Sequence, residues 1–130
     1  MQSMEIEENE MIYNKYGLCA IKAYELMQHG MDGEVAWKEA ASEIFGANTS
    51  SAKKSCPKNA FLGIWGLEKR NGKNANYAYK ALDVVSKMPF EEIEKIKPSD
   101  FWKKCLGMNK KYNGQIDVIF ALIDKQYLKV

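Results

Sequence analysis

The chain has few of the residues that metal sites and disulfide frameworks need. Its 130 residues include one histidine and three cysteines, and Cys19, Cys56 and Cys105 are odd in number and widely spaced. Such a set matches neither the spacing of zinc ligands nor a framework of paired bridges. We therefore expect free thiols in a cytoplasmic protein, with no metal and no cofactor.

Long apolar runs are also missing. No segment approaches the roughly 20 apolar residues that a membrane-spanning helix needs, and the N-terminus is acidic where a signal peptide is basic. Glycine patterns of the kind that bind nucleotide phosphates are absent as well. The chain is 46% hydrophobic and 28% charged, which is typical of a soluble globular protein. Its length predicts a single domain, and the lack of long apolar runs predicts no membrane contact.

Apolar residues recur every three or four positions along most of the chain, as they do in amphipathic helices. Residues 1–8 lack this pattern and are predicted to be a disordered tail, which leaves 9–130 as one helical domain. The first predicted helix begins near Asn9. No alternating pattern indicates a strand, so the sequence predicts a compact all-α domain of six to seven helices.

Turn and cap residues predict where the other helices begin and end. Asp32 is the predicted N-cap of a second helix that Gly46 ends, and Asn74 is the predicted N-cap of a fourth. The third predicted helix runs over residues 57–69, with Pro57 at its first position, where the missing N–H costs nothing.

Two halves of the chain, residues 9–72 and 73–130, resemble each other. Short matches such as 60–64 with 118–122 recur in the same order, and each half reads as a long helix, a tryptophan-bearing helix and an apolar helix. This pattern predicts two related three-helix halves packed about a pseudo-twofold axis. The loop over 49–58 has no counterpart in the second half.

Charge is unevenly distributed although the net charge is only +2. Residues 1–46 carry a net −6, whereas residues 47–82 carry a net +6. The two regions could attract each other in the folded protein. Alternatively, the basic segment 53–80 could present one face to nucleic acid, another anion or an acidic partner.

The unmatched loop is the predicted binding surface. It precedes a helix N-terminus, and we expect Cys56 to be the N-cap of that helix. Positive charge at a helix N-terminus with nearby lysines favours an anion or a reactive thiolate. Cys56 is therefore also a weak catalytic candidate, but His29, the single histidine, is predicted at the end of the first helix and provides no adjacent base. The candidate binding residues are Ser50, Ser51, Lys53, Lys54, Ser55, Cys56 and Lys58.

Several segments together resemble a bacterial family of small helical proteins that is defined only as a domain of unknown function. The segments are 16–23, 36–46, 113–118 and, most recognisably, 56–63, where the family has Cys-Pro-Lys-Gly-Ala-Phe-Leu-Gly. The resemblance covers about residue 14 to the C-terminus. It departs at Asn59, where the family has glycine, and at Trp65, where it has a more polar helix end. The resemblance implies a shared helical fold and no assigned activity.

The sequence thus favours a non-enzymatic binding or interaction module of a bacterial or phage cytoplasm, with an unknown protein partner. Two alternatives stay open. One is a nucleic-acid-binding regulator that uses the basic segment 53–80, and the other is a thiol-dependent enzyme or redox sensor at Cys56.

Overall fold

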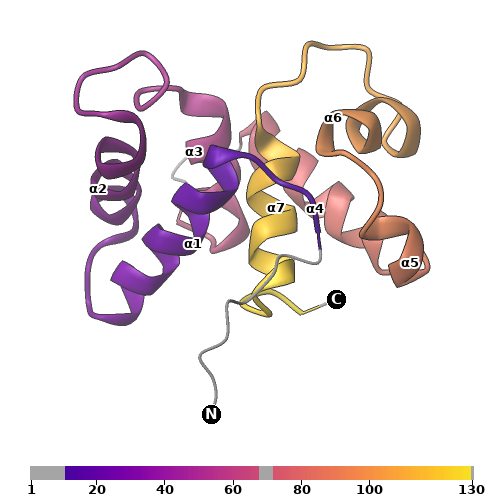
Figure 1. Ribbon diagram of the computed structural model, residues 1–130, viewed down its shortest axis with the longest axis horizontal. Helices are drawn as coiled ribbons and strands as arrows, with labels where there is room; N and C mark the ends of the chain where they lie inside the picture. The colour runs from indigo at the N-terminus through magenta and orange to yellow at the C-terminus, as the bar shows by residue number, and fades with distance from the viewer. Residues whose placement is uncertain (1–10, 68–71, 130) are drawn as a thin grey trace.

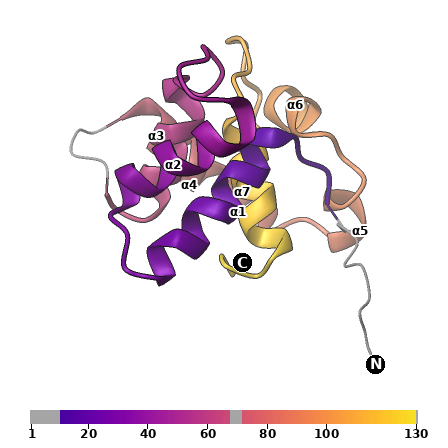
Figure 2. The same ribbon diagram turned by 60° about the vertical axis from the view of Figure 1, so that its left-hand side comes forward.

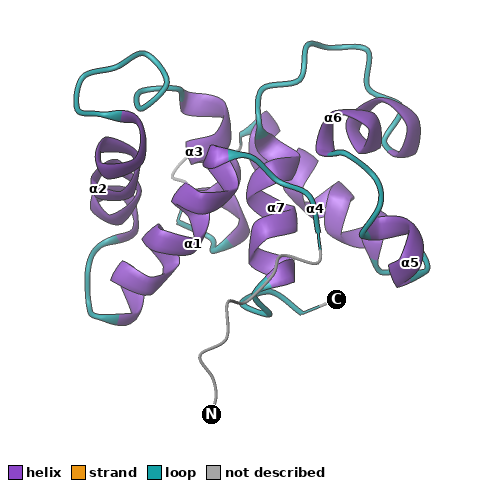
Figure 3. Ribbon diagram, viewed as in Figure 1, coloured by secondary structure: helices purple, strands orange, loops and turns teal. Residues whose placement is uncertain are grey.

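A computed structural model describes residues 11–67 and 72–129, and this part of the chain is helical with no strand (Figure 3). The predicted all-α class is confirmed, with seven α-helices and one π-helical turn over the described residues. None of the described helices is both long enough and apolar enough to span a membrane. The elements are α1 (Lys15–Gln28), α2 (Gly33–Phe45), α3 (Ser55–Ile64), α4 (Lys73–Val85), α5 (Phe90–Ile93), α6 (Pro98–Asp100), η1 (Phe101–Cys105) and α7 (Gln115–Asp124).

Helix α7 lies at the centre of the molecule and packs against α1, α3, α4 and α6 (Figures 1 and 2). Residues 115–122 are all buried, and six of these eight are apolar, which is expected of a helix at the centre of a core. Aromatic side chains surround this centre. Phe101 packs edge-on against Phe120 of α7, and Trp37 of α2 packs against Phe61 of α3.

The chain before α1 is extended and lies along α7 (Figure 1). The backbone N–H of Met11 donates to Asp124 Oδ1 over 3.1 Å, and the backbone N–H of Asn14 donates to Asp117 Oδ1 over 2.8 Å. Tyr13 Oη donates to the other oxygen of Asp124 over 3.0 Å. Two carboxylates seven residues apart on α7 thus fix this segment.

The prediction that the first helix begins near Asn9 was wrong. Asn9 itself lies outside the described residues, as does the predicted tail 1–8, but residues 11–14 are not helical and α1 begins at Lys15. Asn14 is the N-cap, because its side chain accepts a hydrogen bond from the N–H of Tyr16 at 2.9 Å.

Both predicted ends of α2 are confirmed, whereas the predicted end of α3 is wrong. Asp32 is the N-cap of α2 and Gly46 its C-cap, as expected. Helix α3 ends at Ile64, before the predicted end at residue 69, which itself lies outside the described residues. Gly66 has φ 71° and its N–H donates to Gly63 O, while the N–H of Leu67 donates to Leu62 O. This is a Schellman motif, so Gly66 ends the helix instead of lying inside it.

The arrangement separates α1, α2 and α3 from α4, α5, α6 and η1, with α7 between the two groups (Figure 1). Helices α3 and α4 also pack against each other across this division. The internal duplication of two three-helix halves stays a prediction.

Gly17 allows α1 to approach α7 closely, and its replacement tests this contact. A Cβ atom at residue 17 would lie 2.9 Å from both the carbonyl oxygen of Asp117 and the Cβ of Ala121. Because neither atom is the end of a flexible side chain, we expect Gly17→Ala to lower the free energy of unfolding by about 1–3 kcal/mol in urea titrations. Lys15→Ala on the exposed surface of the same helix should change it by only about 0.5 kcal/mol. Equal stability of the two variants would contradict the close approach.

Candidate functional site

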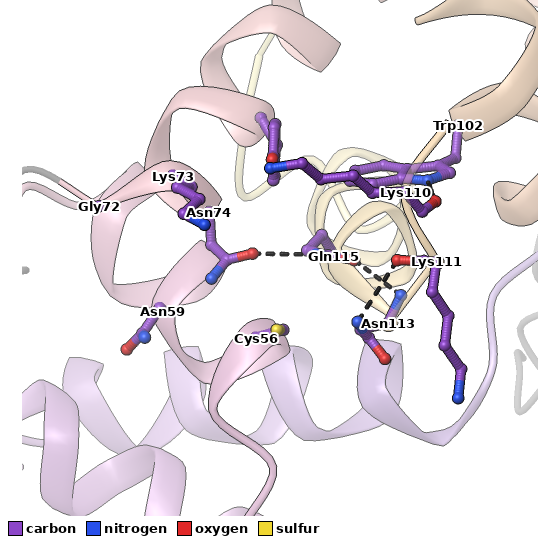
Figure 4. A pocket seen from close by; sticks show the side chains of 11 residues that line it. Cys56, Asn59, Gly72, Lys73, Asn74, Trp102, Lys110, Lys111, Asn113 and Gln115 are labelled. Atoms are coloured by element: carbon purple, nitrogen blue, oxygen red, sulfur yellow. Dashed lines mark hydrogen bonds between the residues drawn. The ribbon is translucent and has the colours of Figure 1, made fainter. Parts of the chain in front are cut away.

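A cavity of about 540 Å³ opens between the first turns of α3, α4 and α7 (Figure 4). Its volume lies within the range of small-molecule binding sites. We call it cavity A. Its lining comes from α3, α4, η1, α7 and the loop that precedes α7, and it comprises Cys56, Asn59, Gly72, Lys73, Asn74, Tyr77, Trp102, Lys110, Lys111, Asn113 and Gln115.

Three helices begin at cavity A, and none of the three is capped by the side chain of its own N-cap residue. Their N-cap residues, Lys54, Gly72 and Gly114, make no side-chain capping hydrogen bond. The other two long helices, α1 and α2, are capped by Asn14 and Asp32. First-turn N–H groups without partners carry the positive end of the helix dipole. In α7 the N–H of Asp117 donates instead to Tyr112 Oη, and the Asp117 carboxylate lies in the same first turn, so α3 and α4 are the two helices whose N-terminal ends contribute positive potential to the cavity.

Amide side chains join the first turns of α4 and α7. Gln115, only 2% exposed, donates through Nε2 to Asn74 Oδ1 at 2.9 Å and accepts from the backbone N–H of Asn113 at 3.0 Å (Figure 4). Asn74 was predicted to be the N-cap of the fourth helix, and that prediction was wrong. Gly72 is the N-cap, and Asn74 instead connects α4 to α7. Both amides are thereby fixed in the cavity wall.

The loop over 107–114 is held by hydrogen bonds at two points. Trp102 Nε1 donates to the carbonyl of Lys110 at 2.8 Å. Tyr112 Oη donates to Asp117 Oδ2 at 2.5 Å and accepts from the N–H of Asp117 at 2.8 Å. Burial raises the pKa of Tyr112, and the neighbouring Asp117 raises it further. These contacts fix the loop that brings Lys110 and Lys111 to cavity A.

The charge of the lining is of one sign. Lys73, Lys110 and Lys111 are exposed around the cavity, and its lining includes no carboxylate and no histidine. The amide groups of Asn59 and Asn74 add neutral hydrogen-bonding groups. Lysines and helix N-terminal N–H groups both donate hydrogen bonds, so the lining is suited to an anion that is rich in acceptor oxygens.

Cys56 is the predicted site residue that lines cavity A. It is half-buried, and Figure 4 shows its sulfur directed toward the side of the cavity formed by Asn113 and Gln115. The expectation that Cys56 is the N-cap was wrong, because Lys54 is the N-cap and Cys56 is the second helical residue. Pro57, at the third position, still lies in the first turn, where backbone N–H groups lack helical acceptors.

Two other predicted residues, Lys53 and Lys58, line a second cavity of about 290 Å³, here called cavity B. Lys58 Nζ also lies 3.3 Å from Glu34 Oε2. Ser50, Lys54 and Ser55 are exposed and line neither cavity, and the carbonyl of Ser51 accepts a hydrogen bond from Tyr16 Oη at 3.1 Å. The lining of cavity B is Trp37, Lys38, Ser42, Asn48, Ala52, Lys53 and Lys58.

The predicted residues are therefore divided between two cavities on either side of the first turn of α3. Sequence reasoning missed most of cavity A, including Trp102, Lys110 and Lys111. The sequence does contain a pattern that points to this cavity. Asn-Gly pairs at 71–72 and 113–114 both precede a helix, and each places a glycine at the N-cap, next to lysines.

The remaining thiols lie elsewhere. Cys19 is fully buried, and burial raises its pKa to about 12. Cys105 is half-buried and lines a different cavity, and its pKa is raised by burial and then by Glu92. Among the described residues, no group of three or more His, Cys, Asp or Glu side chains could hold a metal ion.

These features define an all-α domain with a basic, amide-lined cavity at the meeting point of three helix N-termini. The chain belongs to the Family of unknown function (DUF6979), whose model matches residues 13–129. This match confirms the expected membership in a family of unknown function. No curated protein and no solved structure matches the chain.

The buried Asp117 carboxyl should leave a measurable pH dependence. Burial raises its pKa above the ordinary 3.8, and hydrogen bonds from Tyr112 and Asn14 oppose the rise. Because the folded state binds the proton more tightly than the unfolded state, this group favours folding most at acid pH and loses that contribution as the pH rises through the folded pKa. Compared with Asp117→Asn, the wild type should therefore gain stability between about pH 7 and about pH 4 in urea titrations. A relative loss on acidification would contradict this.

Proposed function

We propose that the protein is a non-enzymatic binding module of a bacterial or phage cytoplasm and that cavity A binds an anionic ligand. The observation that carries this proposal is the meeting of the N-termini of α3 and α4, both without side-chain caps, with three lysines around one cavity whose lining has no carboxylate. A phosphate or carboxylate group placed there satisfies first-turn N–H groups that the N-cap side chains leave unpaired.

The magnitudes favour an anion over a neutral ligand. A negative charge at one helix N-terminus is stabilised by about 0.3–1 kcal/mol, and by up to about 2 kcal/mol in a partly buried site. Hydrogen bonds to charged groups contribute about 1.5–3 kcal/mol each. Lys73, Lys110 and Lys111 are close enough to the cavity to add such bonds. A ligand with two or more negative groups gains most, because the helix ends and the three lysines that line the cavity belong to different elements.

The lining supports binding more than catalysis. A nucleophilic thiol needs a neighbouring base, and the lining of cavity A contains no histidine and no carboxylate. His29, the single histidine of the chain, is the C-cap of α1 and lies outside this lining.

Removing lysines from cavity A should weaken anion binding. We expect the double variant Lys73→Gln and Lys111→Gln to lower the affinity for tripolyphosphate about 10-fold or more, because each lost charge removes about 1 kcal/mol or more of binding. Isothermal titration calorimetry at low salt measures this, and added salt should weaken the wild type.

The matched control for that variant is Lys87→Gln. Lys87 is exposed, pairs with Asp83 and does not line cavity A. Its replacement should leave the affinity for tripolyphosphate within about 2-fold of the wild type, because a distant exposed charge is screened. Equal weakening by both variants would show only a general effect of net charge, and absence of tripolyphosphate binding by the wild type would contradict the proposed site.

One observation favours a second candidate, a thiol-dependent activity or redox response, because the Cys56 sulfur lines cavity A. The two candidates make different predictions for Cys56→Ser. As a binding module, this variant should retain tripolyphosphate affinity within about 3-fold, because the hydroxyl keeps a donor and an acceptor in place.

Alkylation of Cys56 provides a second measurement on this thiol. Iodoacetamide should modify Cys56 before Cys19, whose thiol is buried and has a pKa of about 12, and the added group should reduce anion binding by occupying cavity A. Peptide mapping and calorimetry measure the two effects. Loss of binding in Cys56→Ser, without loss of folding, would instead favour the thiol candidate.

A further inference from the structure

We infer that the anion bound in cavity A is the backbone of a single-stranded nucleic acid that continues across the first turn of α3 into cavity B. This inference rests on the proposed anion site in cavity A. It adds a second site and a class of ligand, and it can fail while the first site stands.

The first turn of α3 separates the two cavities. Cys56 lines cavity A, whereas Lys58, two residues later on the same helix, lines cavity B. A helix with its side chains is about 10–12 Å wide, so the two cavities are separated by a short distance. Lys54 and Ser55 are exposed at this first turn. A strand that passes from one cavity to the other thus meets a helix N-terminus and no carboxylate of that turn.

Both cavities carry three lysines and no carboxylate in their linings. Lys38, Lys53 and Lys58 line cavity B and match the three lysines of cavity A in number and sign. A compact anion fills one cavity only. A linear chain of phosphates uses both, because its charges repeat along its length.

The contacts indicate a flexible strand bound without sequence preference. Lysine side chains and helix N–H groups recognise phosphates and carry no base information. Trp37 and Trp102 belong to the two linings, but each is only 1% exposed and does not provide a stacking surface. Helix α3 buries Phe61 and Leu62 in the core, so it does not act as a recognition helix in a major groove.

Glu34 provides the sharpest test. Its Oε2 lies 3.3 Å from Lys58 Nζ and 3.8 Å from Lys38 Nζ, and the carboxylate is about half exposed. A phosphate in cavity B must compete with this carboxylate for the same two lysines. Replacing it with a neutral amide should therefore strengthen the binding of a strand, although the fold loses two exposed ion pairs of small value.

The experiment compares oligothymidylates of about 4 and about 20 nucleotides with tripolyphosphate, by fluorescence anisotropy and calorimetry. For the longer strand, Glu34→Gln should raise the affinity about 3- to 10-fold and Lys38→Gln with Lys53→Gln should lower it about 10-fold. The double lysine variant should also reduce the salt slope by about 1.4, from about 0.7 for each lost phosphate contact. The affinity of cavity A for tripolyphosphate should stay within about 2-fold of the wild type in all of these variants, because none of the replaced residues lines that cavity.

The matched control is Asp83→Asn. It removes one negative charge from an exposed pair with Lys87 at 3.3 Å, the same separation as in the pair of Glu34 with Lys58. It lies outside both cavities and should change strand affinity less than about 2-fold. Circular dichroism melts check that every variant is folded.

Three results would overturn the inference. If both oligothymidylates bind no better than tripolyphosphate and Glu34→Gln has no effect, the anion occupies cavity A alone and the proposed function stands. If inorganic polyphosphate of matched length binds more tightly than the longer strand, nucleic acid is the wrong polyanion. If no anion binds the wild type, the inference and the proposed function both fail.

Discussion

The structure depends on how the buried helix α7 satisfies its two buried polar side chains. Asp117, 3% exposed, accepts hydrogen bonds from the backbone of Asn14 and from Tyr112, and Gln115 bonds to Asn74 and to the backbone of Asn113. Unpaired, each of these groups would cost several kcal/mol in the core. Their partners lie in the segment before α1, in the loop before α7 and in α4. The hydrogen bonds of these two side chains therefore fix α4 and the loop, both of which line cavity A.

The same requirement explains how amide side chains come to line a cavity that borders the core. Two of the amides that line it, Asn74 and Gln115, are bonded to each other, and the loop that carries Lys110 is held to Trp102. The lysines therefore project from a fixed frame, and a bound anion needs little ordering of the backbone, which reduces the entropic cost of binding. A close approach at Gly17 and a left-handed Gly114 beneath the ring of Tyr16 allow the segments to come this near.

The helical class and several helix ends were predictable from the local sequence, whereas the residues of cavity A are brought together by tertiary contacts. The helical class, the N-cap Asp32 and the C-cap Gly46 follow from periodicity and cap preference, and the structure confirms them. Asn74 has the chemistry of a cap but bonds to Gln115, 41 residues away, and no local pattern announces such a partner. Cavity A was missed for the same reason, because Lys73 and Lys110 are brought together only when α4 and α7 begin side by side. The basic loop predicted one residue of the cavity A lining, Cys56, and two residues that line cavity B, Lys53 and Lys58.

Three N-cap residues around cavity A make no side-chain capping bond, and they differ in how far the fold alone explains them. Gly114 needs its left-handed φ of 88°, and a Cβ there would lie 3.0 Å from the ring of Tyr16, so packing alone explains that residue. Glycine at the N-cap, as at Gly72, costs only a few tenths of a kcal/mol relative to a good cap. Lys54 is different, because its φ of −65° requires no special residue and Ser55, a better cap, lies one position inside the helix. A serine at this position would have the side chain of a preferred N-cap, and the anion proposed for the first turn would account for the lysine there.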